Sequence, residues 1–323
     1  MILAADSLTP WRRSAPSAWT CLELTLVSNE MLRQWSGYSL KGLLALTTHG
    51  FFSITDKLGN RFVLRVSKDL SQRQVKCEAT VLEGLSCRGI LVPTPVRNDF
   101  GNLLGEVRIS GISYTGLLMT YLEGARFNHA VHWVPQVQRA IGSIIGQIQA
   151  ELDKFRHLTP SNWLDRDLII NASNLLFFND EPILNLLSEL VQKATCIVDD
   201  QGVLIHGDAH PWNFRFRRDQ LGVFDFDNCY IFVGLHDLAV PLQISLDTSF
   251  LNGNPKELIL SWLDGYSTWR PVPDFYREIL EILVGLLRIF RYLSLCRRKR
   301  IGFKIKGLSV ARNIALKGAS LRT

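Results

Sequence analysis

The apolar pattern of this chain changes type near residue 124, and this change constrains the fold more than any other feature. Before it, apolar residues alternate as they do in strands, for example at Phe62, Leu64 and Val66 within RFVLRV. After it, apolar residues recur every three or four positions over 137–152, which is typical of an amphipathic helix. The pattern therefore predicts a small antiparallel-sheet lobe, residues 1–124, followed by a larger and mainly helical lobe, residues 125–323.

Other local signals fill in these two lobes. The turn residues Leu58, Gly59 and Asn60 predict a hairpin that leads into RFVLRV, and Ser71 suits the N-cap of a following helix. Further predicted elements are an extended ILVPTPV segment, a strand over 116–124, and helices over 137–152, 185–193 and 275–297. A chain of 323 residues is also longer than one simple core usually spans. The predicted fold class is therefore α+β, with a cleft between two lobes.

Polar residues gather beside two predicted buried strands in LIHGDAHPWNFRFRRDQLGVFDFDN, residues 204–228. Strand Val203–His206 leads to Asp208, a loop carries Asn213, and strand Gly222–Phe226 carries Asp225. Because a buried charge without a partner is costly, carboxylates in such places need a partner. If the two strands form a hairpin, its loop brings the three side chains together.

The spacing H-x-D-x-x-x-x-N, followed by D-F-D, matches the needs of phosphoryl transfer. In that chemistry one carboxylate, here Asp208, accepts the proton of the acceptor hydroxyl. An amide and a second carboxylate, here Asn213 and Asp225, hold Mg²⁺ against the phosphates, and Mg²⁺ prefers such hard oxygen ligands. The alternative is a polar loop without a catalytic role, and the added D-F-D motif disfavours it.

Five neighbouring residues are interpreted one by one. We expect His206 to hydrogen-bond the loop in place and His210 to line the site. A zinc site at H-x-D-x-H spacing is disfavoured, because no second cluster of His or Cys follows. Asp227 is either a second metal ligand or a structural partner, and Asp237 is either a helix N-cap or a loop anchor. Trp212 either stacks on substrate or nucleotide, or packs on the helical lobe.

The segment HGDAHPWNF…VFDFDNCYIFVGLHDLA resembles the catalytic segment of the aminoglycoside phosphotransferase superfamily, which has the bilobal protein-kinase-like fold. The flanks RFVLRVSK, ILVPTPVRNDFGN, MTYLEGARF, SNWLDRDLI and LDGYSTWRPVP resemble the branch that holds type II homoserine kinases and stress response kinase A. Together these matches run from near residue 45 to near residue 300. The catalytic segment is specific to the superfamily, whereas the flanks do not fix a substrate.

The resemblance implies roles for particular residues. Asp208 matches the catalytic base, and Asn213 and Asp225 match the Mg²⁺ ligands. Arg65 stands where kinases usually place the lysine that grips the ATP phosphates, and Glu78 matches the glutamate that braces it. The strand alternation places Arg65 opposite the apolar face, where it meets either solvent or the cleft.

Two further segments are implied to contact the nucleotide. The backbone from Tyr121 to Glu123 corresponds to the hinge that meets adenine. The phosphate-covering loop corresponds to LTTHGFFS, which has one glycine, Gly50, where a richer glycine loop is usual. The glycine-poor loop and the arginine at position 65 are the main departures from the family pattern.

The expected function is an ATP- and Mg²⁺-dependent phosphotransferase that acts on a hydroxyl group. The acceptor is a homoserine-like amino acid or amino alcohol, or a Ser or Thr of a protein. Arg288 and Arg291 suit an acceptor with a carboxylate or phosphate, unless they form a solvated helix end. Polycationic aminoglycosides fit these arginines less well.

A second hypothesis is a non-catalytic pseudokinase that binds nucleotide, or a protein whose basic tail holds nucleic acid. Gly50 and Arg65 favour this hypothesis, whereas the presence of all three catalytic groups disfavours it. Residues 297–322 carry nine Lys or Arg and no acid. A solvated basic face is favoured there over a contact with nucleic acid.

Location is inferred from cysteines and apolar runs. Six scattered cysteines without a C-x-x-C pair indicate a reducing cytoplasm and no disulfide framework. No apolar run reaches the ~18 residues that a membrane span needs, and no secretory signal is expected at the start of the sequence. The oligomeric state stays open.

Overall fold

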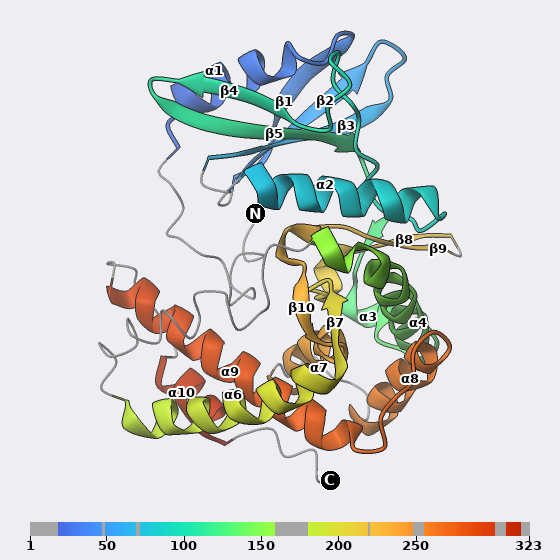
Figure 1. Ribbon diagram of the computed structural model, residues 1–323, viewed down its shortest axis with the longest axis vertical. Helices are drawn as coiled ribbons and strands as arrows, with labels where there is room; N and C mark the ends of the chain where they lie inside the picture. Colours follow the sequence, from blue (N-terminus) through green and yellow to red (C-terminus); the bar gives the residue numbers. More distant parts are fainter. Residues whose placement is uncertain are drawn as a thin grey trace. The chain divides into compact units, whose positions relative to one another are not determined.

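The computed structural model describes residues 19–46, 49–68, 72–158, 180–218, 220–247, 255–300 and 308–317 (Figure 1). The chain divides into two compact units. The sheet unit takes in Arg12–Ala125 and Arg215–Asp227, and the helical unit takes in Arg126–Phe214 and Asn228–Thr323. The architecture is α+β, as the sequence predicts, with an antiparallel sheet in the first unit and mainly helices in the second.

The sheet unit is built on a five-stranded antiparallel sheet with the order β1-β2-β3-β5-β4. Its strands are β1 (Tyr38–Leu46), β2 (His49–Asp56), β3 (Arg61–Ser67), β4 (Gly105–Ile109) and β5 (Ile112–Thr120). The predicted β2–β3 hairpin is confirmed. The Asp56 carboxylate accepts hydrogen bonds from the N–H groups of Leu58 and Asn60, at 2.9 and 2.8 Å. Gly59 takes the left-handed conformation that this turn requires, with φ +84°.

Helix α1 (Cys21–Leu32) contributes to the apolar core on one face of this sheet. Thr20 and Glu23 form a capping box at the start of the helix, which satisfies two of its backbone N–H groups. Buried side chains of α1 join the alternate β3 residues Leu64 and Val66 in this core. The core explains why RFVLRV alternates, because one side of β3 meets α1.

Helix α2 (Gln72–Cys87) follows β3, and its side chains meet the other side of that strand. The predicted N-cap, Ser71, lies outside the described residues. Arg65 on this side is only 1% exposed, because it pairs with Glu78 of α2. Of the two expected surroundings, solvent is therefore excluded, and the expected pairing with Glu78 is present. The charge is buried against a carboxylate.

The helical unit contains the predicted amphipathic helix as α4 (Pro135–Leu152). Its other helices are α3 (His129–His132), the 3₁₀ helix η1 (Asp153–Leu158), α6 (Glu181–Gln201), α7 (His236–Asp247), α8 (Pro255–Ser267), α9 (Tyr276–Arg300) and α10 (Leu308–Leu316). Helices α4 and α8 cross very closely, because glycines stand at the crossing. A Cβ atom on Gly142 or Gly265 would overlap a backbone carbonyl oxygen of the other helix.

Short strands carry the polar stretch of the sequence. Strand β7 (Gly202–Ile205) pairs with β10 (Tyr230–Val233), and β6 (Ala125–Arg126), β8 (Phe214–Arg217) and β9 (Gln220–Val223) have the order β6-β8-β9. The predicted hairpin between Val203–His206 and Gly222–Phe226 is therefore wrong. Strand β9 ends at Val223, because Asp225 has φ +72° and a 3₁₀ helix, η4 (Phe226–Asn228), follows.

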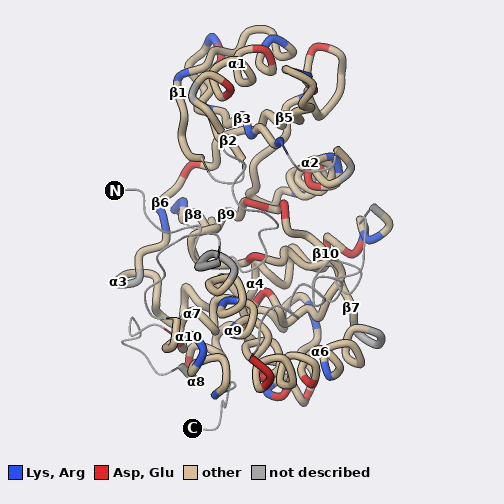
Figure 2. The backbone as a smooth tube through the Cα atoms, turned by 90° about the vertical axis from the view of Figure 1, so that its left-hand side faces the viewer, with Lys and Arg blue, Asp and Glu red and all other residues tan. Residues whose placement is uncertain are grey.

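Charged residues are interspersed along the described backbone of both units (Figure 2). In the predicted basic tail, Arg312 of α10 is held by a bidentate ion pair with Asp180, with N···O distances of 2.6 and 2.7 Å. The Tyr292 hydroxyl donates to the same carboxylate at 2.9 Å. This part of the tail is thus an anchored helix and not a solvated basic face. Among the described helices, none is long and apolar enough to cross a membrane.

Candidate active site

The loop after β7 carries the predicted catalytic base and is tightly constrained. It begins with Gly207, at φ +82°, where a Cβ atom would overlap the carbonyl oxygen of Asn228. Only glycine fits such a place, since it has no Cβ atom. Asp208 follows and is 2% exposed. The loop ends in the short 3₁₀ helix η3 (Pro211–Asn213).

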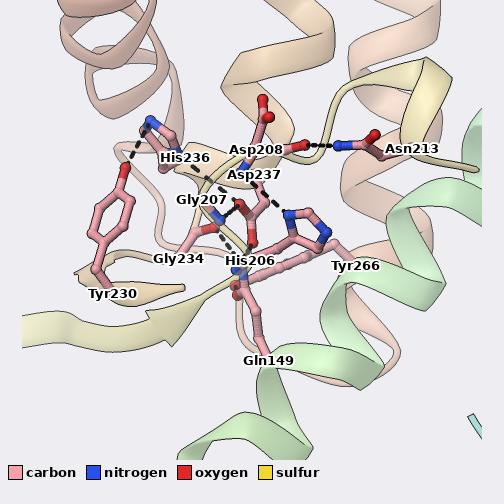
Figure 3. Close-up of polar contacts among 10 residues, drawn as sticks. All are labelled: Gln149, His206, Gly207, Asp208, Asn213, Tyr230, Gly234, His236, Asp237 and Tyr266. Carbon is pink, nitrogen blue, oxygen red and sulfur yellow. Dashed lines mark hydrogen bonds and ion pairs between the residues drawn. The ribbon is translucent and has the colours of Figure 1, made fainter. Parts of the chain in front are cut away.

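Hydrogen bonds bracket the backbone of Asp208 (Figure 3). The His206 ring accepts the N–H of Asp208 at its Nδ1 atom, at 3.2 Å, as the sequence predicts. The Asn213 side chain donates from Nδ2 to the carbonyl oxygen of Asp208, at 3.0 Å. The backbone of Asp208 is thus held from both sides, and its carboxylate is left to other contacts.

Asp237 at the start of α7 anchors the same loop. Its carboxylate accepts the N–H groups of His206 and Gly207, both at 2.9 Å. Burial alone would raise the pKa of Asp237, but electrostatic interactions with His236, 3.9 Å away, and with His206 hold that pKa below its ordinary value. Of the two predicted roles, N-cap or loop anchor, the second is confirmed.

Three residues that the sequence analysis missed extend this anchor. Gln149 of α4 donates from Nε2 to Asp237, at 2.9 Å, and to the carbonyl oxygen of Gly234, at 2.8 Å. The Tyr266 hydroxyl of α8 donates to Gln149 Oε1 at 2.7 Å. His236 lies 3.4 Å from the Tyr230 hydroxyl. One sequence signal could have identified Gln149: it is a polar residue on the apolar stripe of a predicted helix. The structure shows that this glutamine is fully buried.

His210 and Trp212 lie next to the base. His210 is 3% exposed, and its Nε2 atom is 3.8 Å from an Asp208 carboxylate oxygen. Its ring meets the half-buried Trp212 ring edge-on, with centroids 5.5 Å apart. His210 therefore lies beside the predicted base, and its role in lining the site stays a prediction. The contact with His210 does not decide between the two predicted roles of Trp212.

Arg65 and Glu78 form the predicted pair in the sheet unit. Arg65 Nη1 donates to Glu78 Oε1 at 2.7 Å, and Nη2 donates to Oε2. Burial raises the pKa of Glu78 to about 7; Arg65 opposes the rise, and the charges of Asp227 and Asp225 add to it. The fork geometry needs an ionised carboxylate, so the pair is complete only where Glu78 has lost its proton.

Asp225 and Asp227 follow β9 in the same unit. Asp225 takes a left-handed conformation, φ +72°, which is costly for a residue other than glycine and typical of functional loops. Asp227 lies beside His49, the first residue of β2, with Nε2 and Oδ2 3.6 Å apart. His49 is a further residue that the sequence analysis did not single out. It connects the β1–β2 strand pair to the D-F-D segment.

The two predicted metal ligands carry hard oxygen donors of the kind that Mg²⁺ prefers. The Asn213 side chain bonds Asp208 through its nitrogen, which leaves its amide oxygen on the other side, and Asp225 has a carboxylate. Over the described part of the chain, no group of three or more His, Cys, Asp and Glu side chains is arranged to hold a metal ion. Asn213 belongs to the helical unit and Asp225 to the sheet unit.

The predicted nucleotide segments are placed as follows. Gly50 lies inside β2, paired with Leu46 and Val66, so it is a strand residue and not a loop residue. Thr47 and Thr48 of LTTHGFFS, and all of SNWLDRDLI, lie outside the described residues.

The predicted hinge, Tyr121 to Glu123, is tied to Arg61 at the start of β3. Tyr121 N–H donates to the carbonyl oxygen of Arg61 at 3.0 Å, and the Arg61 guanidinium lies 3.8 Å from the centre of the Tyr121 ring. Arg61 also pairs with the half-exposed Glu123, at 3.1 Å. These contacts fix the chain where it leaves the sheet.

Arg288 and Arg291 lie on α9 and meet a carboxylate of α7. Arg288 donates to Asp247 Oδ1 from Nε at 2.8 Å and lies 2.7 Å from it through Nη2. Arg291 is 3.9 Å from the other oxygen of Asp247. The Asp247 side chain is only 2% exposed. The alternative of a solvated helix end is therefore wrong for Arg288, because its charge faces a buried partner.

Comparisons with known proteins agree on one family. A family model described as the phosphotransferase enzyme family matches residues 47–279. A homoserine kinase of Methylobacillus flagellatus is 26% identical over 284 residues, which cover 82% of both chains. A homoserine kinase of Janthinobacterium sp. is 25% identical and covers 76% of this chain and 79% of its own.

Two solved structures share the fold. An amicoumacin kinase in complex with AMP-PNP, Ca²⁺ and Ami superimposes with a TM-score of 0.78 at 18% identity, over 91% of this chain and 92% of that one. A microcompartment-associated aminopropanol kinase superimposes with a TM-score of 0.66 at 16% identity, over 91% and 93%. The chain belongs to the phosphotransferase enzyme family, has its kinase-like α+β fold, and is a phosphotransferase that acts on a hydroxyl group.

Proposed function

We propose that this protein is an ATP- and Mg²⁺-dependent kinase for a small amino acid or amino alcohol with a free hydroxyl, such as homoserine. The observation that carries the proposal is the anchored loop around Asp208, with Asn213 bonded to the backbone of the base. Four backbone groups of this loop are held by hydrogen bonds, which restricts the position of Asp208 as a catalytic base requires.

In the proposed reaction, the Asp208 carboxylate accepts the proton of the acceptor hydroxyl. The acceptor oxygen forms a bond to the γ-phosphorus as the bond from that phosphorus to the β,γ-bridging oxygen breaks, and ADP leaves. Asn213 and Asp225 would hold Mg²⁺, which would supply charge neutralisation at the phosphates. The protein's own contribution is the placement of the base, which the bonds from His206 and Asn213 restrict.

The nucleotide contacts are assigned to the sheet unit. The Arg65 guanidinium, oriented by Glu78, supplies a rigid set of N–H donors for the α- and β-phosphates. The backbone of Tyr121 to Glu123 receives the adenine. Asp227, which pairs with His49, orients the D-F-D segment and is the candidate for a second metal contact.

The choice of acceptor rests on the relatives and on one charge cluster. Two relatives are named homoserine kinases. An amino acid acceptor presents a carboxylate, and the Arg291 guanidinium, which is about one-third exposed and 3.9 Å from Asp247, suits such a group. We therefore assign Arg291 to recognition of the acceptor's carboxylate, with Arg288 and the buried Asp247 holding α9 against α7.

An acceptor panel tests the proposal. The purified chain is incubated with ATP and homoserine, aminopropanol, an aminoglycoside or a Ser/Thr peptide, with Mg²⁺ or with EDTA. ADP release and the ³¹P spectrum of the product are measured. We expect phosphorylated homoserine or a close analogue with Mg²⁺ only, and none with Asp208→Asn. Equal ADP release by Asp208→Asn, or phosphorylation of the peptide alone, would overturn the proposal.

A further inference from the structure

Two buried glutamines of α4 each accept a hydrogen bond from an aromatic side chain of α8. Gln138 accepts the indole N–H of Trp262 at 2.5 Å, and Gln149 accepts the hydroxyl of Tyr266 at 2.7 Å. Both glutamines are fully buried. A buried amide needs such partners, since an unpaired one costs about 1–3 kcal/mol. The two pairs are chemically similar, but they differ in what the glutamine holds on its other side.

Only the Gln149 pair is connected to the catalytic loop. The Gln149 amide nitrogen donates to Asp237, and Asp237 accepts the N–H groups of His206 and Gly207 (Figure 3). In contrast, the Gln138 amide nitrogen donates to the carbonyl oxygen of His132, away from that loop. The structure therefore contains a continuous chain of hydrogen bonds from the Tyr266 hydroxyl to the two residues that precede Asp208.

The backbone packs closely around the side chains of Tyr266 and Gln149 and restricts their movement. A Cβ atom on Gly234 would lie 2.7 Å from the Tyr266 hydroxyl and 3.0 Å from Gln149 Oε1. A Cβ atom on Gly146 would lie 2.9 Å from the carbonyl oxygen of Tyr266. Both glycines are needed because α8 and the β10–α7 turn approach α4 so closely. The Tyr266 hydroxyl and the Gln149 amide are thus confined to one arrangement.

The direction of the bonds follows from the two acceptors around the Gln149 amide nitrogen. The Asp237 carboxylate and the Gly234 carbonyl oxygen only accept hydrogen bonds, so the amide nitrogen must face them. The amide oxygen therefore faces Tyr266, whose buried hydroxyl donates to it. Without the hydroxyl, the buried amide oxygen loses this donor, and the Gln149 amide is held only through its nitrogen.

We propose that Gln149 and Tyr266 are positioning residues for the phosphoryl transfer, which hold the catalytic loop and thereby Asp208 in its working place. This inference rests on the proposed role of Asp208 as the base. It assigns a function to an interface between two helices that themselves carry none of the predicted catalytic groups.

The test compares variants that remove similar hydrogen bonds from the same helix interface. Tyr266→Phe and Gln149→Leu break the chain of bonds to the loop, whereas Gln138→Leu and Trp262→Phe remove the matched pair. All four are measured for their thermal midpoint, for kcat and KM with ATP and the best acceptor, and for amide hydrogen exchange at His206 and Gly207. Activity is read at a temperature where each variant is folded.

We expect similar losses of thermal midpoint in both sets, but a fall in kcat of about tenfold or more only in Tyr266→Phe and Gln149→Leu, with KM for ATP nearly unchanged. Exchange at His206 and Gly207 should accelerate in the same two variants only. An unchanged kcat, or an equal fall in the Gln138→Leu and Trp262→Phe set, would overturn the inference. If Tyr266→Phe does not fold, Gln149→Leu decides by the same criteria.

Asp208→Asn separates this inference from the proposed function. If Asp208→Asn stays active, the proposed base is wrong and the positioning role fails with it. If Asp208→Asn is inactive while Tyr266→Phe is fully active, only the positioning role is wrong. The exchange measurement reports on the loop in either case, because it does not depend on the reaction.

Discussion

At the scale of single residues, Arg65, which stands where related kinases usually have a lysine, has the clearest consequence. Removal of one partner from a buried ion pair usually costs about 3–5 kcal/mol, because the other charge stays buried. We expect Arg65→Met to lower the free energy of unfolding by an amount of this order and to raise KM for ATP. Arg65→Lys should keep most of the stability and lose part of the ATP affinity, since a lysine cannot form the fork. Urea unfolding and ATP kinetics measure both; equal ATP kinetics in Arg65→Met would contradict the assigned phosphate contact.

Glu78 should make stability and ATP binding depend on pH in opposite directions. Its pKa is about 7 in the folded chain against an ordinary value of 4.5, so the folded chain binds more protons between these values. The stability contribution of Glu78 is therefore full below pH 4.5 and is lost as the pH rises through about 7, a change of at most about 3 kcal/mol. ATP affinity should instead rise through about pH 7, because Arg65 is oriented by the ionised carboxylate.

Glu78→Gln tests this dependence. The substitution should flatten both the stability and the ATP affinity between pH 5 and 8, as measured by urea midpoints and calorimetry. Glu83→Gln is the matched control, because Glu83 lies on the same helix and pairs with Arg97 at 2.7 Å on a more exposed face. If stability and ATP affinity still change with pH in Glu78→Gln, another group titrates and the assignment to Glu78 is wrong.

At the scale of elements, local sequence patterns predicted the helices and strands that residues close together in the sequence determine. The alternation in RFVLRV predicted β3, whereas the Arg65–Glu78 pair, now confirmed, was implied by the family resemblance. The partner of β7 was predicted wrongly, because the sequence does not show that Asp225 breaks the strand with a positive φ. The contact of Gln149 with Tyr266 was missed, since it joins residues 117 positions apart, and no local pattern shows which helices will cross.

The C-terminal helix α10 gives a prediction at the same scale. Asp180, next to the start of α6, accepts both the Arg312 fork and the Tyr292 hydroxyl, and Arg312 holds the pKa of Asp180 below its ordinary value. An exposed pair of this kind contributes little to global stability, so its loss should act locally on α10. We expect Arg312→Met to accelerate amide exchange in α10 by about fivefold and to leave kcat unchanged. Lys317→Met, at the exposed end of the same segment, should do neither; a loss of kcat in Arg312→Met would mean that α10 takes part in activity.

At the scale of the whole molecule, the proposed binding of ATP with Mg²⁺ gives a prediction for stability. A ligand that binds only the folded chain stabilises it by about 2.7 kcal/mol at a hundred times its Kd. We therefore expect ATP with Mg²⁺ to raise the thermal midpoint. ATP with EDTA should produce much less of this shift, and Asp225→Ala should lose it, as measured against the variant's own ligand-free midpoint. Calorimetry in which Asp225→Ala gains as much from Mg²⁺ and ATP as the natural chain would remove Asp225 from the site, because its carboxylate would then make no difference to the bound state.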